Sequence, residues 1–408
     1  MSVSYPVERR DRPWLDSRVA YLIGPLDVPS VDRLREAVRR LCDAYPASRL
    51  NWRLDESRRQ WWADRSPESI VTERLWRSDW SAADNTEAIR SDPTVSGPLA
   101  LVRCENHLCL VLSHAIGDGA YATAVLPAVL HGAISGELAE WPHRSGRFPL
   151  LTAGMRTFGR HPSMIRTALD DRYPLAETAA AGPLQPWAPS RRAMAASFPR
   201  ALRDEMISTV AGLKPKVSPF ALLTCAMLRA LDEVGITVSP DVNMMVDLRR
   251  YLGAGWIDGN LVAAVPMRIG ADTTPQDFSA MIRTTMKSGR PLANAMLTSL
   301  RSGGRHVKCA PCIDRIDPNA PVRVTVTDLG NLPQLDRLPY TDELVDYVGT
   351  GIPDGPHGVT LAFAHTAYST TVTAAFHDNV IDPARMERAL QIVTSAPAEL
   401  ISERSAGR

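Results

Sequence analysis

The stretch Ser-His-Ala-Ile-Gly-Asp-Gly at positions 113–119 holds residue types that could do chemistry. His114 is a candidate general base, because an unperturbed imidazole titrates near pH ~6.5. Gly117 and Gly119 flank an acid, so the backbone there can turn sharply and let a ligand or a strand approach closely. Asp118 can either orient the imidazole or brace the loop through an arginine. The stretch therefore indicates proton transfer by a histidine that is held in a glycine-rich loop.

The elements around this loop are expected to hold the histidine rigidly. Leu99–Cys104 and Leu108–Leu112 are short apolar runs on either side of a tight turn, a pattern typical of a β-hairpin. The run from Ala120 to Ile134 is helical in character, and its N-terminus would direct unpaired N–H groups into the same space as His114. We therefore expect a strand–loop–helix unit with the motif in its loop.

Short β-like runs alternate with helical runs in both halves of the chain. In the first half, the pattern predicts a strand at Arg18–Ile23 and a helix that begins after the N-cap Ser30. Residues 172–192 are rich in Pro, Ala and Gly without periodicity, which is typical of an interdomain linker. Beyond the linker, the pattern predicts helices at Pro219–Val234 and after Asp382, and strands at Val242–Leu248, Leu261–Ile269, Val322–Thr327, Val359–Phe363 and Thr370–Phe376.

These patterns predict an α+β protein with two lobes of similar size. The N-terminal lobe, residues 1–171, carries the His-x-x-x-Asp-Gly motif. The linker, residues 172–192, is expected to cross between the lobes, and residues 193–408 form the C-terminal lobe.

The motif His114-x-x-x-Asp118-Gly119 in this setting resembles the signature of the condensation-domain and chloramphenicol-acetyltransferase-like acyltransferase superfamily. Other stretches are similar to condensation domains at compatible positions: LDVPSVDRLREAVRRLCDAYP (26–46), SRLNWRLD (48–55), VNMMVDLRRYL (242–252), IDGNLVAAVPMRI (257–269) and VTDLG (326–330). The resemblance covers most of the chain and includes both lobes.

The resemblance implies two chloramphenicol-acetyltransferase-like lobes with a tunnel between them, into which His114 projects. The donor would be an acyl thioester on coenzyme A or on the phosphopantetheine of an acyl or peptidyl carrier protein. The acceptor would be a small molecule with an amine or a hydroxyl group, and His114 would remove its proton during attack on the thioester, a role worth ~10²–10⁴-fold in rate. No cofactor or metal is needed, because the thioester is already activated.

The resemblance also assigns supporting residues. Asp118 would be structural and would pair with Arg249 of the C-terminal lobe, and Gly119 would complete the motif. The candidate tunnel-lining residues are Ser113, Asn260, Thr327 and Gly330.

The chain departs from condensation domains at Ser113, which stands where the first of two adjacent histidines usually lies. A single histidine is familiar among free-standing acyltransferases, and no carrier-protein attachment motif is visible. We therefore expect a stand-alone enzyme of specialised-metabolite or lipid biosynthesis. Two alternatives stay open: a non-catalytic docking platform for carrier proteins or partner enzymes, and a cyclase or epimerase that uses the same base.

The amino-acid composition favours a soluble globular protein over one that binds nucleic acid or spans a membrane. Of the 408 residues, 45% are hydrophobic, and 46 basic against 45 acidic side chains leave a formal charge of +1. This balance argues against nucleic-acid binding, which needs an excess of Lys and Arg on one face. The N-terminus has charges where a signal peptide would be apolar, and no apolar stretch reaches the ~20 residues that span a bilayer. A soluble, cytoplasmic protein is expected.

Two further signals favour structural explanations. Cys309 and Cys312, with His306 three residues earlier, could supply three metal ligands, but a zinc site needs a fourth and the sequence offers none nearby. We therefore expect no metal site and a loop with incidental cysteines. His365 ends an expected strand, where a hydrogen-bonded structural histidine is favoured over one that faces the tunnel.

Overall fold

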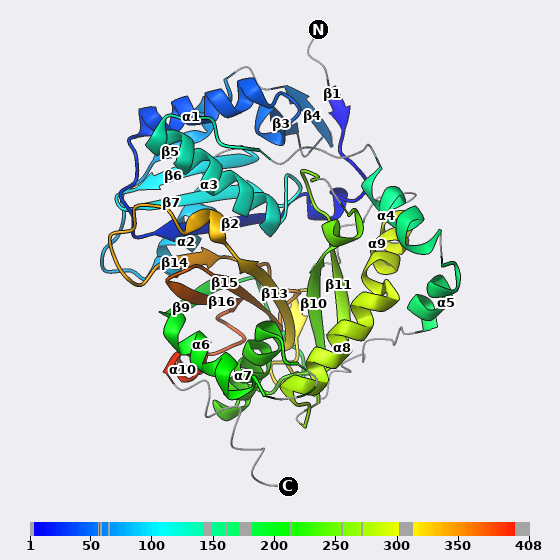
Figure 1. The fold of residues 1–408 in the computed structure, drawn as a ribbon. Coiled ribbons are helices and arrows are strands. Elements are labelled where there is room, and N and C mark those ends of the chain that lie inside the picture. The colour runs from blue at the N-terminus through cyan, green and yellow to red at the C-terminus, as the bar shows by residue number, and fades with distance from the viewer. Residues whose placement is uncertain are drawn as a thin grey trace.

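Two β-sheets organise the chain in the computed structural model shown in Figure 1. The structure describes residues 4–55, 57, 59–63, 66–95, 97–141, 148–159, 161–170, 182–212, 214, 216–253, 256–270, 272–301 and 313–395. In Figure 1 the N-terminal sheet lies in the upper part of the molecule, and the C-terminal sheet lies below it.

The N-terminal sheet has five strands in the order β14-β2-β7-β6-β5. Their bounds are Arg18–Gly24 (β2), Val71–Glu73 (β5), Leu99–Cys104 (β6), His107–Ser113 (β7) and Asp346–Gly349 (β14). Helices α1 (Val31–Ala44) and α3 (Gly119–Ser135) cover one face of the sheet, and α2 (Ala82–Ser91) covers the other. Because both faces are covered, every residue of β7 is buried, which explains the unbroken apolar run Leu108–Leu112 in its middle.

The C-terminal sheet has six strands in the order β11-β10-β13-β15-β16-β9. The pairs β10–β13 and β13–β15 are parallel and the others are antiparallel. The bounds are Arg191–Pro199 (β9), Asp241–Asp247 (β10), Val262–Arg268 (β11), Arg323–Asn331 (β13), Gly358–His365 (β15) and Ser369–His377 (β16).

Helices α7 (Pro219–Glu233), α8 (Pro275–Ser288) and α10 (Pro383–Ser395) share one apolar core with this second sheet. The remaining helices are α4 (Pro149–Phe158), α5 (Ser163–Asp170), α6 (Arg200–Thr209) and α9 (Arg290–Arg301). Figure 1 shows α4 and α5 beside α9, at one edge of the C-terminal lobe.

Short elements complete the described chain. A three-stranded sheet has the order β1-β4-β3, and a two-stranded one pairs β8 with β12. Their bounds are Ser4–Pro6 (β1), Trp52–Asp55 (β3), Gln60–Ala63 (β4), Gln185–Pro186 (β8) and Arg315–Ile316 (β12). The 3-10 helices are η1 (Arg12–Trp14), η2 (Arg49–Asn51), η3 (Pro67–Ile70), η4 (Leu248–Tyr251) and η5 (Pro333–Leu335).

One strand of the second half belongs to the first sheet. After β13 the chain leaves the C-terminal sheet, forms β14 antiparallel to β2, and returns as β15. Tyr347 on β14 lies opposite Ile23 on β2 in the strand register. The two lobes are therefore joined by a shared strand as well as by the chain between them.

The predicted α+β class is confirmed, and the strand–loop–helix unit β7–loop–α3 is present as expected. Ser30 caps α1 through a hydrogen bond from the backbone N–H of Arg33. Of the predicted linker, residues 172–181 lie outside the described residues, while 182–190 include β8 and Arg191 begins β9. Within the described part of the chain, no helix has the length and apolar character needed to cross a membrane.

Candidate active site

His114 lies at the boundary between the two lobes, directly after the last residue of β7. Its backbone N–H donates to the carbonyl of Ser17 at 2.6 Å, so the chain is fixed where it leaves the sheet. The half-buried side chain faces Asn260, which precedes β11 in the C-terminal lobe. We call the contact between the motif loop, residues 113–119, and residues 247–261 the seam.

Asn260 holds His114 at two points. The amide nitrogen of Asn260 donates to the backbone carbonyl of His114, and its Oδ1 lies 2.8 Å from Nδ1 of the imidazole. An amide oxygen can only accept, so Nδ1 must carry the hydrogen and Nε2 keeps its lone pair. Nε2 has no hydrogen-bond partner among the described residues. The structure thus brings together two residues that the sequence analysis selected separately.

Trp14 covers one face of the His114 ring. The two ring centroids are 4.3 Å apart and the planes are inclined by 19°, a stacked geometry. Trp14 ends η1, close to the N-terminus, and nothing in the sequence pattern near it pointed to the site. The stack restricts rotation of the imidazole, so its free nitrogen has a defined direction.

The environment of His114 favours the neutral imidazole. Burial lowers the pKa of His114 below its usual value, and this effect outweighs the opposing influence of Asp118, Asn260 and Asp11. A neutral ring with a free lone pair is the form that a general base requires. His114 can therefore accept a proton at neutral pH.

The predicted ion pair between Asp118 and Arg249 is confirmed. Nη1 of Arg249 lies 2.8 Å from Oδ2 of Asp118, and both side chains are buried. Asp118 also caps α3 by accepting from the N–H of Tyr121, and accepts a further N–H from Leu261 across the seam. Burial alone would raise the pKa of Asp118, but Arg249 and these N–H donors lower it overall. Both carboxylate oxygens of Asp118 are therefore occupied by hydrogen bonds that hold α3 and the seam together.

Both glycines of the motif lie where a side chain would collide. A Cβ at Gly119 would approach Cδ2 of Leu329, on β13, to 2.4 Å. A Cβ at Gly117 would approach the Cβ of Tyr121, a fully buried residue of α3, to 2.5 Å. The glycines therefore allow α3 and β13 to close around the motif loop.

The other candidate tunnel-lining residues are placed as follows. Ser113 is 1% exposed, and its hydroxyl has no hydrogen-bond partner in the described part of the chain. Thr327 is half-buried on β13, opposite Ala362 of β15. Gly330, at φ +74°, is the next-to-last residue of the same strand, and no described atom lies within 4 Å of a Cβ placed there. That these residues line a tunnel stays a prediction.

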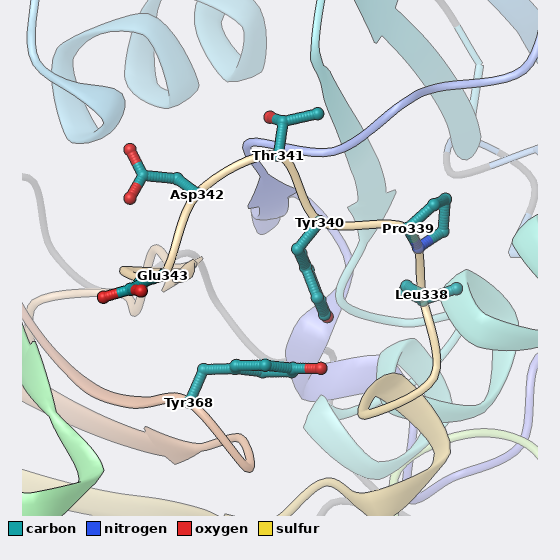
Figure 2. A pocket seen from close by; sticks show the side chains of 7 residues that line it. All are labelled: Leu338, Pro339, Tyr340, Thr341, Asp342, Glu343 and Tyr368. Carbon is teal, nitrogen blue, oxygen red and sulfur yellow. The ribbon is translucent and has the colours of Figure 1, made fainter.

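Figure 2 shows a cavity whose lining residues differ from those of the candidate site. It measures about 600 Å³ and is formed by the segment that leads into β14 together with Tyr368 from the β15–β16 turn. Its lining residues are Leu338, Pro339, Tyr340, Thr341, Asp342, Glu343 and Tyr368. None of them is a candidate site residue.

The two weaker sequence signals have different outcomes. His365 is buried and its Nδ1 lies 2.9 Å from the hydroxyl of Thr370, as expected of a hydrogen-bonded histidine, whereas Nε2 makes no hydrogen bond within the described residues and lies 3.5 Å from a carboxylate oxygen of Asp328. His306, Cys309 and Cys312 lie outside the described residues. Within the described ranges, no three His, Cys, Asp or Glu side chains are grouped so that they could hold a metal ion.

Comparison with solved structures identifies the architecture. Polyketide synthase associated protein 5 from Mycobacterium tuberculosis is similar with a TM-score of 0.58 and 18% identity, over 97% of this chain and 100% of that one. The condensation domain of Monacolin K polyketide synthase MokA gives a TM-score of 0.63 and 10% identity, over 98% of both chains. The epimerization domain from the third module of tyrocidine synthetase B gives 0.57 and 11%, over 100% and 99%.

At these identities the likeness establishes the fold. The chain has the condensation-domain fold over nearly its whole length, which confirms the fold that the motif and its companion stretches predicted. No protein-family model matches the chain, and no curated protein sequence does. The chemistry has to be argued from the site itself, because one fold can host several reactions.

Proposed function

We propose that this chain is an acyltransferase that joins a thioester-bound acyl group to an amine or hydroxyl acceptor, with Nε2 of His114 as the general base. The observation that carries the proposal is the state of the imidazole. Its Nδ1 is engaged with Asn260, its Nε2 has no hydrogen-bond partner among the described residues, and its pKa is lowered by burial. It lies at the seam, where substrates from two sides could meet.

The reaction needs only one proton carrier. Nε2 takes the proton from the acceptor as its oxygen or nitrogen attacks the carbonyl carbon of the thioester. The carbon–sulfur bond then breaks, and the proton passes from Nε2 to the departing sulfur. The products are an ester or amide and a free thiol, and His114 returns to its neutral form.

The surroundings of His114 favour acyl transfer over epimerization, which needs a second acid–base group on the opposite side of the substrate. Trp14 occupies one face of the ring. Two carboxylates, Asp118 and Asp11, act on the pKa of His114, and each forms an ion pair with an arginine. Neither is available as a proton donor.

The architecture supports a choice of donor class. Condensation domains belong to polyketide and nonribosomal peptide assembly, and similar solved structures include such domains. An acyl chain on a carrier protein's phosphopantetheine, or on coenzyme A, is therefore the proposed donor, and specialised-metabolite or lipid assembly the proposed setting. A docking platform without catalysis would have no use for a neutral, oriented base.

The test is single-turnover transfer from acyl-loaded coenzyme A and acyl-loaded carrier protein to a panel of amine and alcohol acceptors, followed by intact mass. Transfer by the parent chain and its loss in His114→Ala would support the proposal. His131→Ala serves as the control, because His131 is exposed on α3 and has no part in the site. Equal transfer in both variants would remove His114 from the mechanism and favour the docking platform.

A further inference from the structure

Asp11 is a fully buried carboxylate that lies directly behind the Asn260–His114 contact. Its Oδ1 accepts from the backbone N–H of Asn260 at 3.1 Å and from the side-chain amide nitrogen at 3.3 Å. Its Oδ2 accepts from Nη2 of Arg49 at 2.6 Å. Both oxygens of Asp11 therefore act as acceptors in these hydrogen bonds, as an ionised carboxylate must.

Arg49 keeps Asp11 in this role. Burial alone would lower the pKa of Arg49, but the charges of Asp11 and Glu8 raise it overall, so the guanidinium stays charged. Its Nη1 also donates to the carbonyls of Ala115 and Ile116, both at 2.9 Å. Arg49 thus fixes Asp11 and the loop that follows His114 with one side chain.

The charge on Asp11 dictates the direction of the hydrogen bonds that lead to the imidazole. A carboxylate accepts only, so the amide nitrogen of Asn260 must face Asp11. The amide oxygen then faces Nδ1 of His114, and since it too accepts only, Nδ1 must be the protonated nitrogen. The tautomer of the ring is set by a carboxylate that does not touch it.

The same N-terminal segment holds the ring from other sides. Trp14, three residues after Asp11, stacks on the imidazole, and Ser17 accepts the backbone N–H of His114. Within residues 11–17, Asp11 therefore anchors the amide of Asn260, Trp14 anchors the face of the imidazole, and Ser17 anchors the backbone of His114.

We propose that Asp11 is a positioning residue that acts through Asn260 to keep His114 in the Nδ1-protonated tautomer, with Nε2 free to act as the base. The consequence for turnover rests on the proposed function, whereas the tautomer is a property of the free protein. It can therefore be tested without a substrate.

The test is nitrogen-15 NMR of the histidine rings in the full chain, at a pH well above ~6.5 so that the ring is neutral. The His114 signals are identified by their loss in His114→Ala. In the parent, Nε2 should be of the pyridine type and Nδ1 of the pyrrole type. In Asp11→Asn the side chain can donate, the amide of Asn260 can turn over, and the tautomer ratio should shift toward Nε2–H by roughly tenfold.

Asp258→Asn is the matched control. Asp258 is buried in the same network and accepts from the backbone N–H of Arg49 at 2.9 Å and from Nε1 of Trp256 at 3.1 Å. Within the described residues, its carboxylate forms no hydrogen bond with the side chain of Asn260 or His114. This variant should lose stability but keep the parent tautomer, which separates positioning from general loosening.

Asn260→Ala is the second variant, for the case that Asp11→Asn does not fold. It leaves the Asp11–Arg49 ion pair in place and removes the link to the ring, so the tautomer preference should fall to a similar extent. A parent-like tautomer in either folded variant would overturn the proposal, because the backbone carbonyl of His114 would then suffice to keep Nδ1 protonated. A shifted tautomer in a chain whose parent transfers no acyl group would refute the proposed function and leave this inference standing.

Discussion

Asp118 and Arg249 face each other across the seam as a two-point ion pair. Nη1 of Arg249 lies 2.8 Å from Oδ2 and Nη2 lies 3.2 Å from Oδ1. Arg249 also donates to the carbonyls of Ile257 and Gly259, the residues that lead to Asn260. The pair therefore aligns the histidine of one lobe with the amide of the other.

Removing one partner of this pair should be costly. Asp118→Ala leaves the Arg249 guanidinium buried without its counter-charge and removes the cap of α3, so the free energy of unfolding should fall by about 3–5 kcal/mol. Urea denaturation measures this directly.

An exposed ion pair provides the control for Asp118→Ala. Asp170→Ala removes the contact to Nε of Arg166, at 3.6 Å on the exposed side of α5, and should cost less than about 1 kcal/mol. If Asp118→Ala unfolds like the parent and loses only turnover, Asp118 takes part in the chemistry and its structural assignment is wrong.

Gly117→Ala should destabilise the motif loop. The new Cβ would lie 2.5 Å from the Cβ of buried Tyr121, and neither can move without shifting the first turn of α3. Overpacking of this kind costs about 1–3 kcal/mol. Gly212→Ala is the matched control, since no atom of the described residues lies within 4 Å of a Cβ there. Equal unfolding free energies for the two variants would mean that the loop relaxes freely.

The stability of the N-terminal lobe should depend on pH through His107, which stacks on Trp76. Burial lowers the pKa of His107 to about 4, against ~6.5 in the unfolded chain. Between these values the unfolded chain binds a proton that the folded chain does not, so stability is complete above ~6.5 and falls as the pH drops toward 4. The loss should approach about 3 kcal/mol.

His107→Leu isolates this effect. Comparing urea denaturation of the parent and the variant between pH ~7 and ~4 cancels the carboxylates that titrate in both. The variant should lose less stability over this range than the parent. Parallel pH profiles for the two chains would show that His107 is protonated equally in the folded and unfolded states.

The dependence on His114 should differ between acceptors. An alcohol is a poor nucleophile while protonated, so His114→Ala should lower single-turnover transfer to an alcohol by ~10²-fold or more, and to an amine by less. Because burial lowers the pKa of His114, the parent rate should be flat near neutral pH and fall only below ~6.5. A rate that still climbs with pH above 7 for the alcohol would identify a different base.

Local sequence patterns were enough to predict the strand–loop–helix unit and to select His114 as the candidate base. The apolar run of β7, the glycines around Asp118 and the helical run of α3 are contiguous, so local pattern was enough to put His114 at a strand end. The pairing of Asp118 with Arg249 came from resemblance to a known family, and the structure confirms it.

Tertiary structure decided that β14, which lies in the second half of the chain, joins the N-terminal sheet. β14 has four residues, and a pattern that short cannot say which sheet it will join. Its place beside β2 follows from the backbone groups that the edge of the N-terminal sheet leaves unpaired. The sequence-based assignment of residues 193–408 to one lobe contained no signal for this exchange.

The residues that surround His114 were also placed by tertiary structure. Trp14 and Asp11 belong to a short segment with no periodic pattern, and Asn260 is far away in the other half of the chain. Their roles depend on atoms that meet only after both sheets have formed and the seam has closed, because a hydrogen bond or ring stack needs contact within a few ångströms. Residue type identified the side chain that is proposed to accept a proton, and long-range packing brought Asn260, Asp11 and Trp14 around it.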